Sequence, residues 1–131
     1  KVRSYLSNGY FLQIAGKAPT YSGHSLTALG SPTAAAPGTE QFGINAVANT
    51  SPANFGADPV QVPSSEFSYG TVEPNYSTPN LYMYQPGGTV ARSLVALGQT
   101  DYTISMIINV ANNTPAGRYA TDFSAVVVPM Y

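Results

Sequence analysis

The sequence contains no cysteine, no tryptophan and a single histidine, and charged residues make up only 8% of its 131 positions. Without cysteine, the chain forms neither disulfide bonds nor cysteine-ligated zinc sites, and it has no thiol nucleophile. Five Lys or Arg residues against six Asp or Glu residues leave a net charge of −1. Because such a chain offers no strongly basic surface, we expect neither nucleic acid nor an anionic membrane as a partner.

Long apolar runs are also missing. The longest, residues 125–128, is far shorter than the roughly 20 residues that a membrane-spanning helix needs, so we expect no membrane insertion. The chain does not open on Met, and Lys1-Val2-Arg3 already has strand character. We expect residues 1–131 to form a single domain with its own core, and this start is consistent with a longer exported precursor.

Small polar residues, glycine, proline and ten tyrosines take the place of charge. Short alternating segments bounded by Gly, Pro and Asn recur along the chain, and no window carries the apolar spacing of an amphipathic helix. We therefore predict an all-β fold. The most probable architecture is an antiparallel two-sheet sandwich, immunoglobulin-like or jelly-roll-like, with long loops.

The first half of the chain gives two local predictions. Residues 2–6 and 10–14 flank Asn8-Gly9, which indicates a tight hairpin or one long strand with a glycine bulge, and we favour the bulged strand. Residues 18–37 are rich in Gly, Pro, Ser and Ala and are predicted to form a long loop, with at most one helical turn at 26–29.

The middle of the chain is punctuated by prolines. Residues 41–48 alternate as a half-buried strand does, and residues 49–65 suggest a surface excursion with a short edge strand at 60–62. Residues 67–84 are predicted to hold two short strands, and a turn at 86–88 precedes a strand at 89–97.

The strongest pattern lies between residues 100 and 131. Apolar side chains at every second position predict one strand with a buried face, and a turn follows at 112–117. A second alternating strand comes next, so we expect a long antiparallel hairpin at the centre of a sheet. The predicted buried faces are Tyr102, Ile104, Met106, Ile108 and Val110 in the first strand and Tyr119, Thr121, Phe123, Ala125 and Val127 in the second.

One order of motifs resembles a known family. The segments are TEQFGIN (39–45), VANT (47–50), GADP (56–59), DYTIS (101–105) and TPAGRY (114–119). With them, nearly the whole chain resembles secreted surface proteins of Saccharibacteria and related Patescibacteria. The resemblance implies export and a cell-surface role, and it supplies no catalytic residue.

The end of the chain carries a second, shorter likeness. Residues 114–131 are similar to the closing strand of spore-coat-U-like pilin domains, in which a Pro-Ala-Gly turn leads into a strand that ends in an aromatic residue. Pilins of that group usually carry cysteines, which this chain lacks.

Motifs for chemistry are scarce. His24 is the only histidine and lies in a predicted loop, and no Gly-x-Ser-x-Gly elbow is present. The six carboxylates are dispersed along the chain, and no Asp-x-Asp-x-Asp loop offers calcium its oxygens. We therefore predict that the protein is not an enzyme and has no catalytic residue, metal site or cofactor.

Four tyrosines in the Asn- and Ser-containing stretch 69–84 have two interpretations. Their rings can form a sugar-binding platform, or they can pack between strands of a half-buried sheet. We favour packing, because tryptophan, the strongest stacking residue, is absent. The candidate glycan-binding residues are Tyr69, Tyr76, Tyr82 and Tyr84.

These features favour a non-catalytic structural protein of the cell surface. We expect a secreted subunit that self-associates into a surface filament or pilus-like layer by β-strand pairing. The strand-pairing candidates come from both ends of the chain: Val2, Tyr5, Val126, Val127, Val128 and Tyr131. The alternative is an adhesin that binds glycans or a host-cell surface through loops 18–37 and 49–65 or through the tyrosines.

Overall fold

The computed structural model describes residues 1–4, 7–63, 70–95 and 97–131. Within these ranges the regular structure consists of antiparallel β ladders and one short 3₁₀ turn, η1 (Pro74–Tyr76). The all-β prediction is therefore confirmed, whereas the immunoglobulin-like or jelly-roll-like subtype stays a prediction. No described helix is long and apolar enough to cross a membrane.

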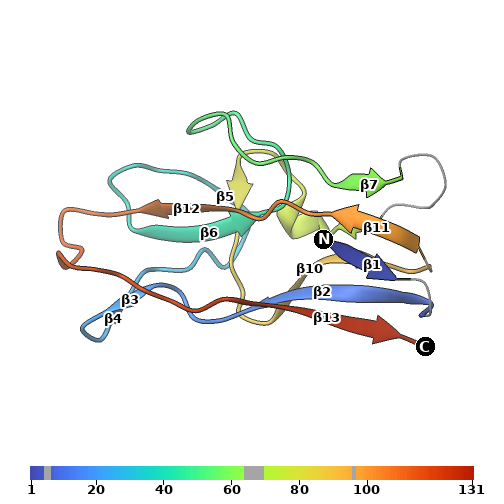
Figure 1. Cartoon of the computed structure of the whole chain (residues 1–131). Helices are drawn as coiled ribbons and strands as arrows, with labels where there is room; N and C mark the ends of the chain where they lie inside the picture. The colour runs from blue at the N-terminus through green and yellow to red at the C-terminus, as the bar shows by residue number, and fades with distance from the viewer. Residues whose placement is uncertain (5–6, 64–69, 96) are drawn as a thin grey trace.

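One layer of the molecule is a four-stranded sheet (Figure 1). Its order is β13 (Ser124–Met130), β2 (Gly9–Ala15), β10 (Gly88–Ser93) and β8 (Thr71–Val72). The longest ladder joins β13 to β2, from Ser124 opposite Ala15 to Met130 opposite Gly9. The last described strand is thus paired to one of the first, and it forms an edge of this sheet.

The other layer contains two ladders placed end to end (Figure 1). In the first ladder, β11 (Leu97–Asp101) lies between β1 (Val2–Ser4) and β7 (Val60–Val62). In the second, β12 (Ser105–Asn109) pairs with β6 (Gln41–Asn45). They share a layer because the chain continues directly from β11 into β12. Two small ladders complete the described strands: the hairpin of β3 (Thr20–Tyr21) with β4 (His24–Ser25), and the long-range pair of β5 (Thr33–Ala34) with β9 (Leu81–Tyr82).

The hydrophobic core lies between the two layers. Tyr10, Leu12 and Ile14 alternate along β2 and are all buried, which gives that strand one apolar face. Two clusters of buried residues fill the space. The larger comprises Ile14, Leu26, Phe42, Ile44, Ala46, Tyr76, Met83, Tyr84 and Val90, and the smaller comprises Val2, Tyr10, Leu12 and Ala91.

Several local predictions for the first half are corrected. Residues 2–6 and 10–14 form neither a hairpin nor one bulged strand, because β1 pairs with β11 and β2 pairs with β10 and β13. β2 begins at Gly9, whose φ is +140°. A Cβ at this position would clash with the carbonyl oxygen of Ser93, so glycine is required here. Around 26–29 there is no helical turn; Ala28 forms a parallel bridge with Phe42 instead.

Predictions for the middle of the chain fare better. The short edge strand at 60–62 is confirmed as β7, and the described part of 67–84 contains the two expected short strands, β8 and β9. The strand at 41–48 is β6, but all five of its residues are buried rather than half of them. This strand is covered on its other face too, where Leu29 and Tyr82 lie against Gly43.

The predicted C-terminal hairpin is wrong. β12 pairs with β6 and β13 pairs with β2, so the two strands of the expected hairpin belong to different layers. β13 lies at the edge of its sheet and not at the centre. The alternation identified two real strands, but each finds a better-buried partner that is remote in sequence.

Candidate functional site

The separation of β12 from β13 leaves an open seam along one side of the sandwich. In the described part of the chain, β12 has a single ladder partner, β6, and β13 has a single ladder partner, β2. Their other edges lie on the same side of the molecule, since residues from both strands line a common groove. We call the space between β12 and β13 the seam.

Hydrogen-bonding directions within β6 show which backbone groups of β12 point into the seam. Ile44 exchanges backbone hydrogen bonds of 2.9 and 3.0 Å with Met83, on the side of β6 away from β12. Because these directions alternate along an antiparallel strand, Gly43 and Asn45 must face β12. Their partners there are Ile107 and Ser105. The N–H and C=O groups of the intervening residues of β12, Met106 and Ile108, therefore point outward.

The burial of β12 reverses the sequence prediction. Ser105 and Ile107 are buried, whereas Met106 and Ile108 are 49% and 51% exposed. The buried face of β12 lies against the loop that contains Gly56, because a Cβ at Gly56 would clash with Oγ of Ser105. The same loop and residues 106–109 line a shallow surface pocket. Met106 and Ile108 instead face the seam, where no described strand covers them.

The seam is apolar and reaches the core. A groove of about 220 Å³ lies at its centre, and a second space of about 360 Å³ continues it past Met106 and Ile108. The central groove is lined by Ile14, Ile44, Ile104, Met106, Phe123 and Ala125. Two of these residues, Ile14 and Ile44, belong to the main core cluster. The groove thus extends from the surface to the core of the protein.

Aromatic contacts fix the side of the seam that is formed by β13 and the residues before it. Phe123, just before β13, stacks on Phe42 with ring centroids 5.7 Å apart and planes inclined by 11°. Tyr84 packs edge-on against both rings, at 5.6 Å from Phe123 and 4.9 Å from Phe42. The β13 side of the seam is therefore packed against the aromatic part of the core.

Proline and charge protect the other edges that the structure describes, as is common for edge strands. β7 lies between Pro59 and Pro63, β8 has two residues, and β1 carries Arg3. β13 contains Pro129. By contrast, β12 has no proline and no charged residue within its five positions.

The position of Pro129 follows from the same alternation. The carbonyl of Ile14 accepts a hydrogen bond from Gly87, on the β10 side of β2. Gln13 and Phe11 must then face β13, opposite Val126 and Val128. Pro129 consequently faces the outer edge, where its missing N–H costs no ladder bond and interrupts pairing with a further strand.

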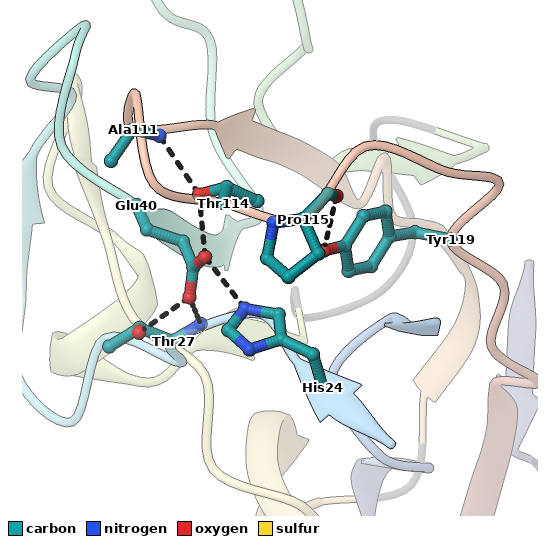
Figure 2. A network of polar contacts seen from close by, with 7 residues as sticks. All are labelled: His24, Thr27, Glu40, Ala111, Thr114, Pro115 and Tyr119. Atoms are coloured by element: carbon teal, nitrogen blue, oxygen red, sulfur yellow. Dashed lines mark hydrogen bonds and ion pairs between the residues drawn. The ribbon is translucent and has the colours of Figure 1, made fainter. Parts of the chain in front are cut away.

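A polar cluster fixes the end of β12 next to the seam (Figure 2). Thr114, in the turn after β12, donates a hydrogen bond of 2.7 Å to Oε2 of Glu40, the residue before β6. The same oxygen contacts His24 Nε2 at 2.8 Å, and Oε1 accepts bonds from the backbone N–H and the hydroxyl of Thr27. These bonds, Thr114 first, lower the pKa of Glu40 to about 2.

Asn109, the last residue of β12, adds a second contact between the same strands. Its side-chain N–H donates a hydrogen bond of 2.8 Å to Oε1 of Gln41, the first residue of β6. Gln41 also accepts a bond from the backbone N–H of Ala36 and donates to the carbonyl of Ala34. The seam is therefore presented by a strand that is anchored at its end.

The predicted strand-pairing residues lie in different environments. Val2 is buried in β1, and Tyr5 lies outside the described residues. Val126, Val127 and Val128 belong to β13, where each is roughly two-fifths exposed, and they are paired to β2 within the same chain. Tyr131 follows β13 and is 93% exposed.

The tyrosine platform is corrected. Tyr76, Tyr82 and Tyr84 are each no more than 3% exposed, so their rings have no face free for a sugar. The hydroxyl of Tyr82 donates to the Ser51 carbonyl and that of Tyr84 to the Gly16 carbonyl, both at 2.8 Å. The rings pack inside, as the favoured interpretation held, and Tyr69 lies outside the described residues.

The sequence predicts Met106, Ile108 and Val110 to be buried, but they are 49%, 51% and 56% exposed. A signal was present, because three consecutive apolar residues, Met106 to Ile108, interrupt the alternation of a half-buried strand. Over the described ranges, no three His, Asp or Glu side chains come together as a metal site would require.

The chain was also compared with known proteins. Neither the family models, nor the curated proteins, nor the solved structures include a match to this chain. The family resemblance drawn from the sequence motifs therefore stays a prediction.

Proposed function

We propose that the protein is a non-catalytic, extracellular structural subunit that self-associates by β-strand pairing at the free edge of β12. The observation that carries the proposal is the combination of outward backbone groups at Met106 and Ile108 with half-exposed apolar side chains on the same residues. An edge with these properties is a template for another strand unless something blocks it.

The surface composition supports an assembling protein. A net charge of −1 on 131 residues gives little electrostatic repulsion between copies. The resemblance to secreted surface proteins supports an extracellular location and a filament or pilus-like layer as the final assembly. The assembly surface moves from the terminal strands to β12, because the free edge of β13 is interrupted by Pro129 and that of β12 contains no proline.

The adhesin alternative is the weaker proposal. The burial of three of its four candidate tyrosines removes the platform on which it partly rested. It now depends on loops 18–37 and 49–65 alone. A glycan array with the wild-type protein tests it directly, and specific binding to one glycan class would restore it.

Sedimentation velocity over a wide concentration range, with electron microscopy of the same samples, tests the assembly proposal. The wild type is expected to self-associate, and Ile108→Lys to shift the protein to monomers by at least tenfold in apparent dissociation constant. Val60→Lys is the matched control, because Val60 is equally exposed, at 53%, on the proline-flanked edge β7. A wild-type protein that stays monomeric throughout would exclude the proposal.

A further inference from the structure

This inference rests on the proposed function and concerns which strand of a second copy pairs with β12. The free edges of that second copy narrow the choice. Its first and last described strands, β1 and β13, are each paired along one edge, and they carry Arg3 and Pro129 respectively. Among the other described edge strands, β6 is bridged on its outer side to Ala28 and Met83, β7 is flanked by prolines, and the rest have two residues each. We infer that the strand received by β12 is β12 of a second copy, paired about a two-fold axis at Ile107.

Symmetry fixes the direction of this pair. Two identical edges that meet about a two-fold axis perpendicular to the strands run antiparallel. The intrachain ladder already uses this direction on the same side, because β1 runs antiparallel to β11, with Val2 opposite Thr100. β1 stops beside Asp101, where Lys1 forms an ion pair of 3.5 Å. Beyond this point the edge of β12 is uncovered, and the partner strand continues the line of β1.

Backbone chemistry selects the register. The outward groups belong to Met106 and Ile108, so the centre of the pair falls between them. Met106 of each copy then lies opposite Ile108 of the other, and both pairs exchange two backbone hydrogen bonds. The two Ile107 residues face each other as the central pair without hydrogen bonds. A register centred on Met106 would place Ile108 opposite Ile104, and one centred on Ile108 would place Met106 opposite Val110, and both of these partners lie outside β12.

The side chains fit the same arrangement. Met106 and Ile108 of both copies meet on the seam face, where opposite apolar pairs on neighbouring strands are favourable. The charged residue lining this part of the seam is Arg118, beside Ile108. A two-fold axis at Ile107 places the two arginines at opposite ends of the pair, which keeps like charges apart. The result is a four-stranded sheet in the order β6, β12, β12 and β6.

Such a pair is a closed dimer, because each copy uses the same edge only once. The filament or pilus-like layer would then be built from dimers through a second contact. The structural unit that the edge of β12 specifies is therefore the dimer.

Single cysteines test the register cleanly, because the chain contains none of its own. Met106→Cys and Ile108→Cys are made separately, mixed in equal amounts and oxidised mildly. The inferred register predicts a disulfide-linked dimer in the mixture, in at least fivefold excess over either variant alone. Val60→Cys mixed with Ile108→Cys is the control, since Val60 is as exposed but lies on β7.

The outcomes separate the inference from the proposed function. Cross-linking of Met106→Cys with itself as efficiently as in the mixture would indicate another register and overturn the inference. Self-association of the wild type that Ile108→Lys abolishes, but without any cross-link in the mixture, would mean that β12 pairs with a different strand. In that case the proposed function stands and the two-fold pair is wrong. A wild type that is monomeric at all concentrations would remove both.

Discussion

Glu40 and Thr114 lie 74 residues apart in the sequence and are joined by a hydrogen bond of 2.7 Å from the Thr114 hydroxyl to the Glu40 carboxylate. This bond connects the turn after β12 to the start of β6, the strand that pairs with β12. It also brings the mostly buried Glu40 carboxylate into contact with His24 and Thr27. Glu40 thus links three segments of the chain at one end of the seam.

Acid should weaken this connection. The folded state lowers the pKa of Glu40 from 4.5 to about 2, so the ionised form stabilises the fold at any pH above about 4.5. That stabilisation is lost as the pH falls from about 4.5 to about 2. Urea denaturation at several pH values should show the loss in the wild type, whereas Glu40→Gln should be less stable at neutral pH and flatter across this window.

Glu73→Gln is the control for that experiment. Glu73 forms an ion pair of 3.0 Å with Arg92, whose side chain is 43% exposed. An exposed pair of this kind contributes about 0–1 kcal/mol. The variant should therefore keep the acid dependence of the wild type, and an equally flattened profile would assign the effect to charge in general.

Gly43→Ala should destabilise the protein through the strand that supports β12. A Cβ at Gly43 would lie 2.8 Å from Cβ of Tyr82 and 3.1 Å from Cδ1 of Leu29, in a fully buried strand. Forced packing of this kind costs about 1–3 kcal/mol in the free energy of unfolding. Gly30→Ala, which meets no atom within 4 Å, is the matched control and should change stability little.

Substitution of Tyr82 should affect stability and not sugar binding. Tyr82→Phe removes the hydrogen bond to Ser51 and should cost about 0.5–1.5 kcal/mol. Tyr82→Ala empties a fully buried site and should cost about 3–5 kcal/mol. Tyr131→Ala, at a side chain that is 93% exposed, should leave the urea midpoint unchanged. A wild-type midpoint in Tyr82→Ala would contradict the core assignment.

Pro129→Val should create a second pairing edge. The substitution restores an outward N–H to β13, next to exposed valines, and removes the interruption that proline provides. Light scattering should then detect assemblies larger than those of the wild type. The same substitution combined with Ile108→Lys should still increase self-association, because the new edge does not use β12. Unchanged scattering in both backgrounds would show that Pro129 does not protect this edge.

The sequence by itself determined the strand content and the positions of several turns and proline breaks between strands. Alternation at 10–14 and 41–45 marks real strands, the alternating run 119–127 overlaps the start of β13, and the prolines around 60–62 mark a real edge strand. It also indicated a strand at 105–109 as part of a longer run. These features are local, because backbone preference and the two-residue period act over a few neighbouring positions.

Only the tertiary structure decided which strands pair. Alternation gives each strand an apolar face but does not specify which strand it pairs with, so the turn at 112–117 favoured a hairpin that does not form. Instead, β12 pairs with β6 in one layer and β13 pairs with β2 in the other. The apolar surface that these two pairings bury outweighs the advantage of a hairpin with a short turn. The same choice left Met106 and Ile108 at an open edge, because it separated β12 from β13.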